Sequence, residues 1–293
     1  MRRKIIAVAL SVMMGAMAFA GCGSSSKKEE AKQADVKAVD TSKWSKEVKK
    51  IVERGVLRVG VKNAVVGFGY QDPVTNEYSG MEISLAQKIA DNLGVKVEYT
   101  AVTAATRTEL LDSGDIDCVL ATFTITDERK KSWDFSTPYY TDYVTVLVEK
   151  AKNIKTVADL KDKKVGVSSG STSAKALVKQ MIEKKVIAGD SFDEEKFDPA
   201  TWKEGVTFQQ YDDYPTISTA LSAGEVDAFC VDKSILAIYL TDSRSYIEDK
   251  FSPQEYGVAT KKGSELSAAV EDYIKGWLAD GTIDKLMEEN KLK

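Results

Sequence analysis

Residues 110–140 read LLDSGDIDCVLATFTITDERKKSWDFSTPYY and decide how the chain is expected to fold. A helix end at Gly114 precedes the apolar run 116–121, which predicts a buried parallel strand. A threonine-rich exit containing Arg129 follows this strand. Ligands bind beyond the carboxyl ends of such strands, and the arginine fork matches a carboxylate in two hydrogen bonds. The stretch therefore indicates a site for a small anionic group. The alternative is a surface helix with a solvated Arg-Lys-Lys run.

A weak internal repeat suggests that the chain has two similar halves. Residues 58–62 (RVGVK) are echoed by 164–168 (KVGVS), and residues 111–117 (LDSGDID) are echoed by 221–227 (LSAGEVD). Both halves thus read strand, loop and helix, followed by helix, glycine, acid and strand, which is typical of βαβ units. We expect an α/β fold of two lobes, each a mostly parallel sheet flanked by helices. The extended runs 143–148 and 254–260 are predicted to cross between the lobes as a hinge.

Composition excludes several classes of function. The 293 residues carry 45 acidic and 41 basic side chains, so no basic excess points to nucleic acid. There is no histidine, which removes histidine-dependent catalytic triads and histidine-ligated zinc. We predict no metal site and no cofactor. Cys118 and Cys230 each lie in a predicted buried strand and are expected to be core thiols rather than a disulfide.

The N-terminus is predicted to be a targeting segment. A basic start and an apolar run precede Ala20-Gly21-Cys22, which resembles a bacterial lipoprotein cleavage site with Cys22 as the lipidated residue. An ordinary secretory signal with an incidental cysteine is the alternative. Residues 23–43 hold almost no large apolar side chains and are expected to form a flexible tether. We therefore expect an exported protein held at the cell membrane by lipid on Cys22, with 1–22 as its signal peptide.

The run 124–131, with Asp134-Phe135-Ser136 and Pro138-Tyr139-Tyr140 behind it, resembles the signature of the solute-binding proteins of polar amino acid ABC importers. The resemblance extends from about Val56 to the C-terminus. It implies the type II periplasmic-binding-protein-like fold, with residues 44–145 plus 256–293 as lobe 1 and 146–255 as lobe 2. It also implies a monomeric receptor, not an enzyme, whose partners are an amino acid and a membrane permease.

The resemblance assigns roles to several polar residues. Arg129 would hold the ligand carboxylate, with Thr124 donating a hydroxyl. Ser171 and Thr172 match the family's second carboxylate clamp, although simple N-capping of the following helix is the alternative. In the family, the aspartate at the position of Asp232 receives the ligand ammonium, and an N-cap is again the alternative.

Specificity depends on two further cations. Lys62 and Arg107 would add positive charge near the cleft, and a side-chain carboxylate on the ligand would supply their partner. Together with Thr122 and with Tyr214 as a hydroxyl donor, these residues resemble the aspartate/glutamate-binding receptors in particular. We therefore predict a receptor for an acidic amino acid.

Three alternatives to this prediction stay open. Lys62 and Arg107 could be neutralised by a carboxylate of the protein, for which Glu82, Glu109 and Asp142 are candidates. A neutral polar ligand such as glutamine or cystine would then suffice. Less favoured are an enzyme of the cyclohexadienyl dehydratase type on the same fold, and a sensor or adhesin. Among the aromatic residues, Phe68 is the expected cleft wall.

Overall fold

The computed structural model describes residues 45–293. The predicted signal peptide, the tether and Cys22 lie outside these residues. The first element is helix α1 (Lys46–Arg54), which begins after the N-cap Ser45 and ends at Gly55.

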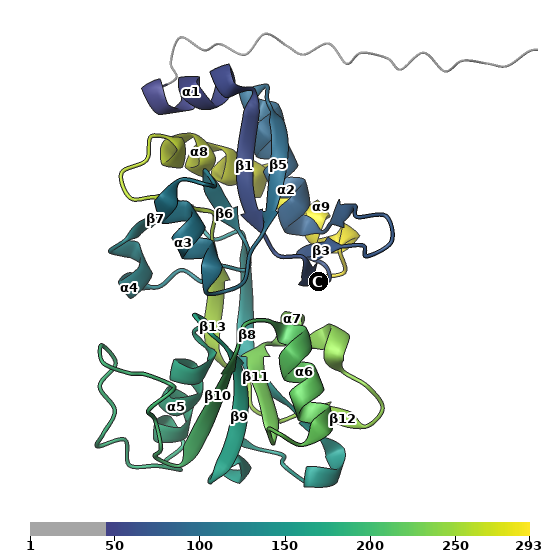
Figure 1. The fold of residues 1–293 in the computed structure, drawn as a ribbon, viewed down its shortest axis with the longest axis vertical. Helices are drawn as coiled ribbons and strands as arrows, with labels where there is room; N and C mark the ends of the chain where they lie inside the picture. Colours follow the sequence, from purple (N-terminus) through teal and green to yellow (C-terminus); the bar gives the residue numbers. More distant parts are fainter. Residues whose placement is uncertain (1–44) are drawn as a thin grey trace, which may run out of the picture. The chain divides into compact units, whose positions relative to one another are not determined.

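The first sheet has the order β5-β1-β6-β14-β7 (Figure 1). Strands β1, β5 and β6 are parallel, whereas β14 is antiparallel to β6 and β7 is antiparallel to β14. A small sheet of β2, β3 and β4 follows β1 in the chain. We call the part of the chain built on these sheets the first lobe. Its strands are β1 (Val56–Val61), β2 (Ala64–Val65), β3 (Gly69–Gln71), β4 (Tyr78–Ser79), β5 (Lys96–Ala101), β6 (Cys118–Leu120), β7 (Trp133–Phe135) and β14 (Ala259–Lys261).

The second sheet has the order β10-β9-β11-β8-β12 and forms the second lobe. Strands β10, β9 and β11 are parallel, and β8 and β12 complete the sheet in antiparallel pairing. The two-lobed α/β fold is thus as predicted, with parallel strands extended by antiparallel ones. The strands of this lobe are β8 (Tyr140–Glu149), β9 (Lys163–Ser168), β10 (Val206–Tyr211), β11 (Ala228–Asp232), β12 (Arg244–Tyr246) and β13 (Phe251–Tyr256).

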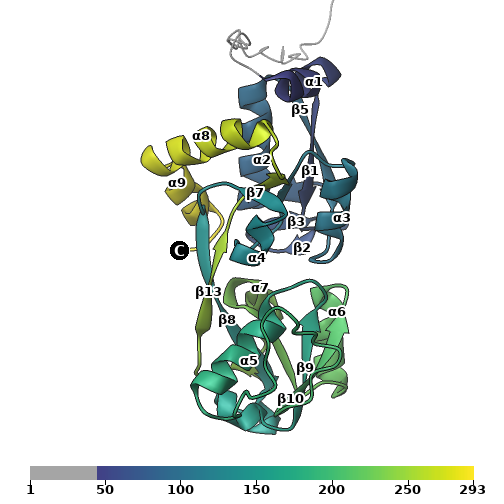
Figure 2. The ribbon, with the colours of Figure 1, turned by 90° about the vertical axis from the view of Figure 1, so that its left-hand side faces the viewer.

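Helices flank both sheets (Figures 1 and 2). Besides α1, the first lobe has α2 (Met81–Leu93), α3 (Thr106–Ser113), α4 (Asp127–Lys130), α8 (Leu266–Ala279) and α9 (Thr282–Glu289). The second lobe has α5 (Ser173–Glu183), α6 (Tyr214–Ala223) and α7 (Lys233–Leu236), with short 3-10 turns η2 (Lys150–Lys152), η3 (Val157–Leu160) and η4 (Ala237–Tyr239). Helices α8 and α9 follow one another at the C-terminal end of the chain.

Two antiparallel strands connect the lobes. β8 pairs with β13 from Tyr140–Tyr256 to Val144–Phe251, and both strands run between the sheets (Figures 1 and 2). After β13 the chain rejoins the first lobe, because Ser136 N–H donates to the carbonyl of Val258 at 2.9 Å. The predicted return crossing therefore begins earlier, at the start of β13.

The internal repeat has a structural basis. Helices α3 and α6 end at glycines in the left-handed conformation, Gly114 with φ 84° and Gly224 with φ 73°, which favours a residue without Cβ. The acids that follow, Asp117 and Asp227, each accept a hydrogen bond from a backbone N–H of the neighbouring parallel strand. These N–H groups belong to Arg58 and Lys164, which are themselves echo partners in the sequence. The two lobes thus repeat one structural unit.

The core confirms the expected thiols and corrects one aromatic assignment. Cys118 and Cys230 are free and buried, and burial raises the pKa of both thiols. Phe68, predicted as the cleft wall, is instead fully buried and packs edge-on against Tyr140 and Tyr256. A hydrophobic side chain directly before β3 gains more by joining this core than by facing a polar cleft.

Candidate functional site

The structure brings eight of the nine predicted ligand residues around one small cavity between the lobes. The first lobe supplies residues after β5 and β6, and the second lobe supplies residues after β9 and at the end of β11. The lining residues are Ala104, Arg107, Thr122, Thr124, Arg129, Ser171, Thr172, Ser173, Tyr214, Val231 and Asp232. The cavity volume is about 10 Å³, which is near the least that holds one water molecule. A molecule larger than water therefore does not fit into this cavity as it stands.

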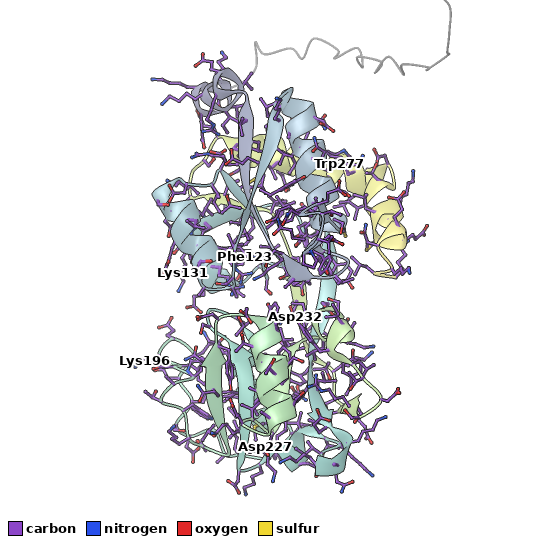
Figure 3. The ribbon with its side chains drawn as sticks, turned by 45° about the vertical axis from the view of Figure 1, so that its right-hand side comes forward. Phe123, Lys131, Lys196, Asp227, Asp232 and Trp277 are labelled. Carbon is purple, nitrogen blue, oxygen red and sulfur yellow. The ribbon has the colours of Figure 1, made fainter. Side chains whose placement is uncertain are left out.

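Strand ends explain why these residues meet. β6 ends at Leu120, β9 ends at Ser168 and β11 ends at Asp232, so the following segments lie at the carboxyl edges of their sheets. Figure 3 shows Phe123 and Asp232 at the facing edges of the two lobes. A larger cavity of about 540 Å³ adjoins the site and is also lined by Ala104 and Arg129.

Both branches of the Arg129 guanidinium are held by backbone carbonyls. Nη1 donates to the carbonyl of Thr124 at 2.8 Å, and Nη2 donates across the lobes to the carbonyl of Gly170 at 3.0 Å. Helix α4 positions this side chain, because Thr126 caps it by accepting the N–H of Arg129. Burial, with the nearby Arg107 charge, lowers the pKa of Arg129 to about 9. An anion at the fork would relieve this cost.

A second guanidinium, that of Arg107, lies beside the same aromatic ring. The Cζ atoms of Arg107 and Arg129 are 4.0 and 4.7 Å from the centroid of the Phe123 ring. Arg107 is 3% exposed, and its Nη1 donates to the carbonyls of Ala121 and Thr122 at 2.8 and 3.2 Å. The contact role of Phe123 was missed in the sequence. Its place between two predicted site threonines, Thr122 and Thr124, was a usable signal.

Lys62 is the one predicted ligand residue outside this cavity. It is buried at the end of β1 and lines an adjoining small cavity that shares Tyr214 with the site. Its Nζ lies 5.5 Å from the centroid of the Tyr214 ring. Burial, reinforced by the charge of Arg107, lowers the pKa of Lys62 well below its ordinary value. Tyr214 thus lines both the cavity beside Lys62 and the cavity that Arg129 and Asp232 line.

Asp232 is a buried carboxylate at the end of β11. Its Oδ2 accepts the hydroxyl hydrogen of Tyr256. Asp232 also occupies the N-cap position of α7, as the alternative had it, but its side chain forms no capping bond there. Burial, with the nearby charge of Asp142, raises the pKa of Asp232 to about 7. Asp142 itself accepts hydrogen bonds from the N–H and hydroxyl of Ser234, so it does not neutralise Lys62 by a direct ion pair. A cationic group on a ligand would restore the ionised form of Asp232.

A glutamine that the sequence analysis assigned no role connects the two walls. Gln254 in β13 is 2% exposed, and its Oε1 accepts the hydroxyl hydrogens of Thr124 at 2.8 Å and Thr172 at 2.7 Å. Two predicted site hydroxyls, those of Thr124 and Thr172, are therefore engaged by one oxygen of the crossing strand.

Four buried side-chain atoms in residues 45–293 lack a hydrogen-bond partner, and all lie in or beside this site. They are Glu82 Oε2, Arg107 Nε, Ser171 Oγ and Ser173 Oγ. Unpaired polar atoms are costly in a protein interior, so their concentration here indicates a site built to meet a polar molecule. Within the same residues, no group of histidine, cysteine and acidic side chains is suited to hold a metal ion. No helix among them has the length and apolar character needed to cross a membrane.

Comparison with known proteins identifies the family. The profile of the bacterial extracellular solute-binding proteins, family 3, matches residues 57–291. The chain belongs to this family. Proteins of this family are extracellular and bind a solute, which is a binding role and not a catalytic one.

Similar proteins cover most of the chain. The ABC transporter glutamine-binding protein GlnH of Bacillus subtilis (strain 168) is 32% identical over 98% of this chain and 97% of its own length. The L-cystine-binding protein TcyJ of Escherichia coli (strain K12) is 36% identical over 82% of this chain and 84% of its own. The structure of an ancestral arginine-binding protein bound to arginine is 35% identical, covers 80% of this chain and 98% of its own, and has a TM-score of 0.67. These named ligands differ in charge, so the ligand of this family member must be argued from its own residues.

Proposed function

We propose that this receptor captures an acidic amino acid, aspartate or glutamate, and delivers it to the permease of an ABC importer. The observation that carries the proposal is the surplus of buried positive charge in the first lobe. Lys62, Arg107 and the Arg129 fork are cations there, and Glu82 is the one carboxylate on that side whose charge acts on Lys62 and Arg107 among the described residues.

The charges of an acidic amino acid match the charges of the site one by one. Its ammonium group pairs with Asp232, and its α-carboxylate pairs with the fork of Arg129. Two cations, Lys62 and Arg107, then face the single carboxylate of Glu82, which leaves one positive charge. A carboxylate on the ligand side chain neutralises it, whereas a neutral side chain leaves it buried and unpaired, which costs several kcal/mol. The hydroxyls of the site complete the contacts, namely those of Thr122, Thr124, Ser171, Thr172 and Tyr214.

Calorimetry of the purified full-length chain tests this proposal directly. We expect aspartate or glutamate to bind at least about tenfold more tightly than glutamine, cystine or arginine. A micromolar dissociation constant, equivalent to about −8 kcal/mol, is within reach of a few charge-assisted bonds in a closed cleft. Tighter binding of glutamine than of both acids would refute the acidic ligand and favour the neutral one that the relatives' names suggest.

Capture is proposed to work by closure of lobe 1 (44–145 plus 256–293) on lobe 2 (146–255), with a monomer as the working unit. The pairing of β8 with β13 supports this hinge. Small-angle scattering with and without glutamate measures it: a smaller radius of gyration on binding is expected, and an unchanged radius contradicts closure.

Anchoring by lipid on Cys22 forms a separate proposal, supported by the sequence around that residue. In cells, the wild-type protein is expected in the detergent phase after Triton X-114 partition, and Cys22→Ala in the aqueous phase. Recovery of both proteins in the aqueous phase refutes the anchor.

A further inference from the structure

Glu82 is a fully buried carboxylate that belongs to no predicted contact with the ligand. It lies in the first turn of α2 and is 0% exposed. Its Oε1 accepts the backbone N–H of Thr122 at 2.6 Å and the hydroxyl hydrogen of Tyr139 at 2.5 Å. Its Oε2 is buried without a partner among the described residues. A carboxylate so placed is costly unless positive charge lies near it.

That positive charge comes from the two cations next to the ligand cavity. The charges of Lys62 and Arg107 both act on the Glu82 carboxyl, against the burial that raises its pKa. Neither cation comes within 4.0 Å of a carboxylate oxygen of residues 45–293, so each is balanced at a distance rather than by a closed ion pair. One carboxylate therefore serves two buried cations.

Glu82 also holds the cavity wall in place. Thr122 has a φ of 46°, a left-handed conformation that is unfavourable for a β-branched residue. Its N–H is fixed by Glu82 and its carbonyl by Arg107, on either side of the strained position. The same carboxylate thus sets both the geometry of this wall and the charge behind it.

We propose that Glu82 is a specificity-determining residue, whose negative charge offsets one of the cations Lys62 and Arg107 and so limits the ligand to a single side-chain carboxylate. This inference rests on the proposed function of the same site. Without the charge of Glu82, both cations would be uncompensated, and the preference for an anionic over a neutral side chain would become stronger.

Glu82→Gln tests the charge while keeping an oxygen for Thr122 N–H and the Tyr139 hydroxyl. The readout is the ratio of the dissociation constants of glutamine and glutamate, measured by calorimetry. We expect this ratio to rise at least about tenfold over the wild type, equivalent to about 1.4 kcal/mol. Tyr139→Phe is the matched control, since it removes a hydrogen bond from the same oxygen without changing charge. It is expected to leave the ratio within about twofold.

A second pair of variants covers the case in which Glu82→Gln does not fold. Lys62→Met alone should lower the ratio, and adding Glu82→Gln to it should restore the ratio toward the wild-type value, because the charges balance again. An unchanged ratio on removal of the Glu82 charge, in folded protein, overturns the inference. A wild type that prefers glutamine overturns the acidic ligand instead, and the change in ratio still tests Glu82. A wild type that binds neither amino acid overturns both.

Discussion

Binding of the ligand ammonium by Asp232 predicts a specific pH dependence. Burial, with the charge of Asp142, raises the pKa of Asp232 from its ordinary 3.8 to about 7 in the free protein. The proposed ion pair requires the ionised carboxylate, so a ligand that binds near pH 6 must displace a proton from this group. Affinity is therefore expected to fall as the solution becomes more acidic.

The size of the effect follows from the raised pKa. A group with a pKa of about 7 is about nine-tenths protonated at pH 6 and about one-tenth protonated at pH 8. Affinity at pH 6 should therefore be about tenfold lower than at pH 8, which corresponds to about 1.4 kcal/mol of binding free energy. The stability of the free protein has the opposite trend. Between pH 4 and pH 7 the folded state keeps a proton that the unfolded state has released, so the free energy of unfolding decreases as pH rises through this window.

Calorimetry in two buffers of different ionisation enthalpy at each pH, phosphate and Bis-Tris at pH 6 and phosphate and Tris at pH 8, measures the proton directly. At pH 6 the difference in binding enthalpy between the buffers should correspond to release of nearly one proton per ligand, and at pH 8 to about one-tenth. Asp232→Asn is the control, because it keeps the shape of the side chain but cannot release this proton. Wild-type affinity that is equal at pH 6 and pH 8 would refute the reasoning, as would an Asp232→Asn variant that binds as tightly as the wild type.

Three further predictions concern single side chains. Arg129→Lys keeps the charge but loses the fork, so affinity for every amino acid ligand should fall about ten- to hundredfold by calorimetry; a change below threefold contradicts the carboxylate role. Lys62→Met should weaken glutamate about tenfold and leave glutamine within threefold, and an equal loss for both would argue against a charge effect. Cys118→Ser places an unpaired hydroxyl in a dry strand and should lower the free energy of unfolding by about 1–3 kcal/mol more than expected from lost volume. Urea denaturation of Cys118→Ser and of Cys118→Ala, compared side by side, checks this prediction. Equal urea midpoints for the two variants would contradict it.

Much of the fold was predictable because it depends on local sequence. The run 56–61 (VLRVGV) predicts a strand and forms β1. The apolar spacing that starts at Met81, with Gly94 as C-cap, predicts a helix and forms α2. The site residues were predicted mainly from the family resemblance. The apolar run before Thr122 and Thr124 supported it, because residues that follow parallel strands gather at one edge of a sheet.

The remaining parts of the site depend on contacts between distant residues. Thr124 and Gln254 are 130 residues apart, and no periodicity links them. Glu82 lies 40 residues from Thr122, whose N–H donates to it. The sequence offered it only as one of three carboxylates that could neutralise Lys62 and Arg107. The position of Lys62 over the ring of Tyr214 likewise depends on packing between the lobes, which patterns in a single sequence do not encode.

Gln254 Oε1 accepts hydrogen bonds from two hydroxyls, and this sharing limits which ligands can bind favourably. The hydroxyls of Thr124 and Thr172 already have an acceptor. A ligand that accepts a hydrogen bond from either one replaces an existing hydrogen bond, so the exchange alone adds little binding free energy. A ligand that displaces these hydroxyls from Gln254 and has no acceptor atoms for them leaves two donors without a partner. The crossing strand thus contributes to discrimination against solutes that lack suitable acceptors, independently of their charge.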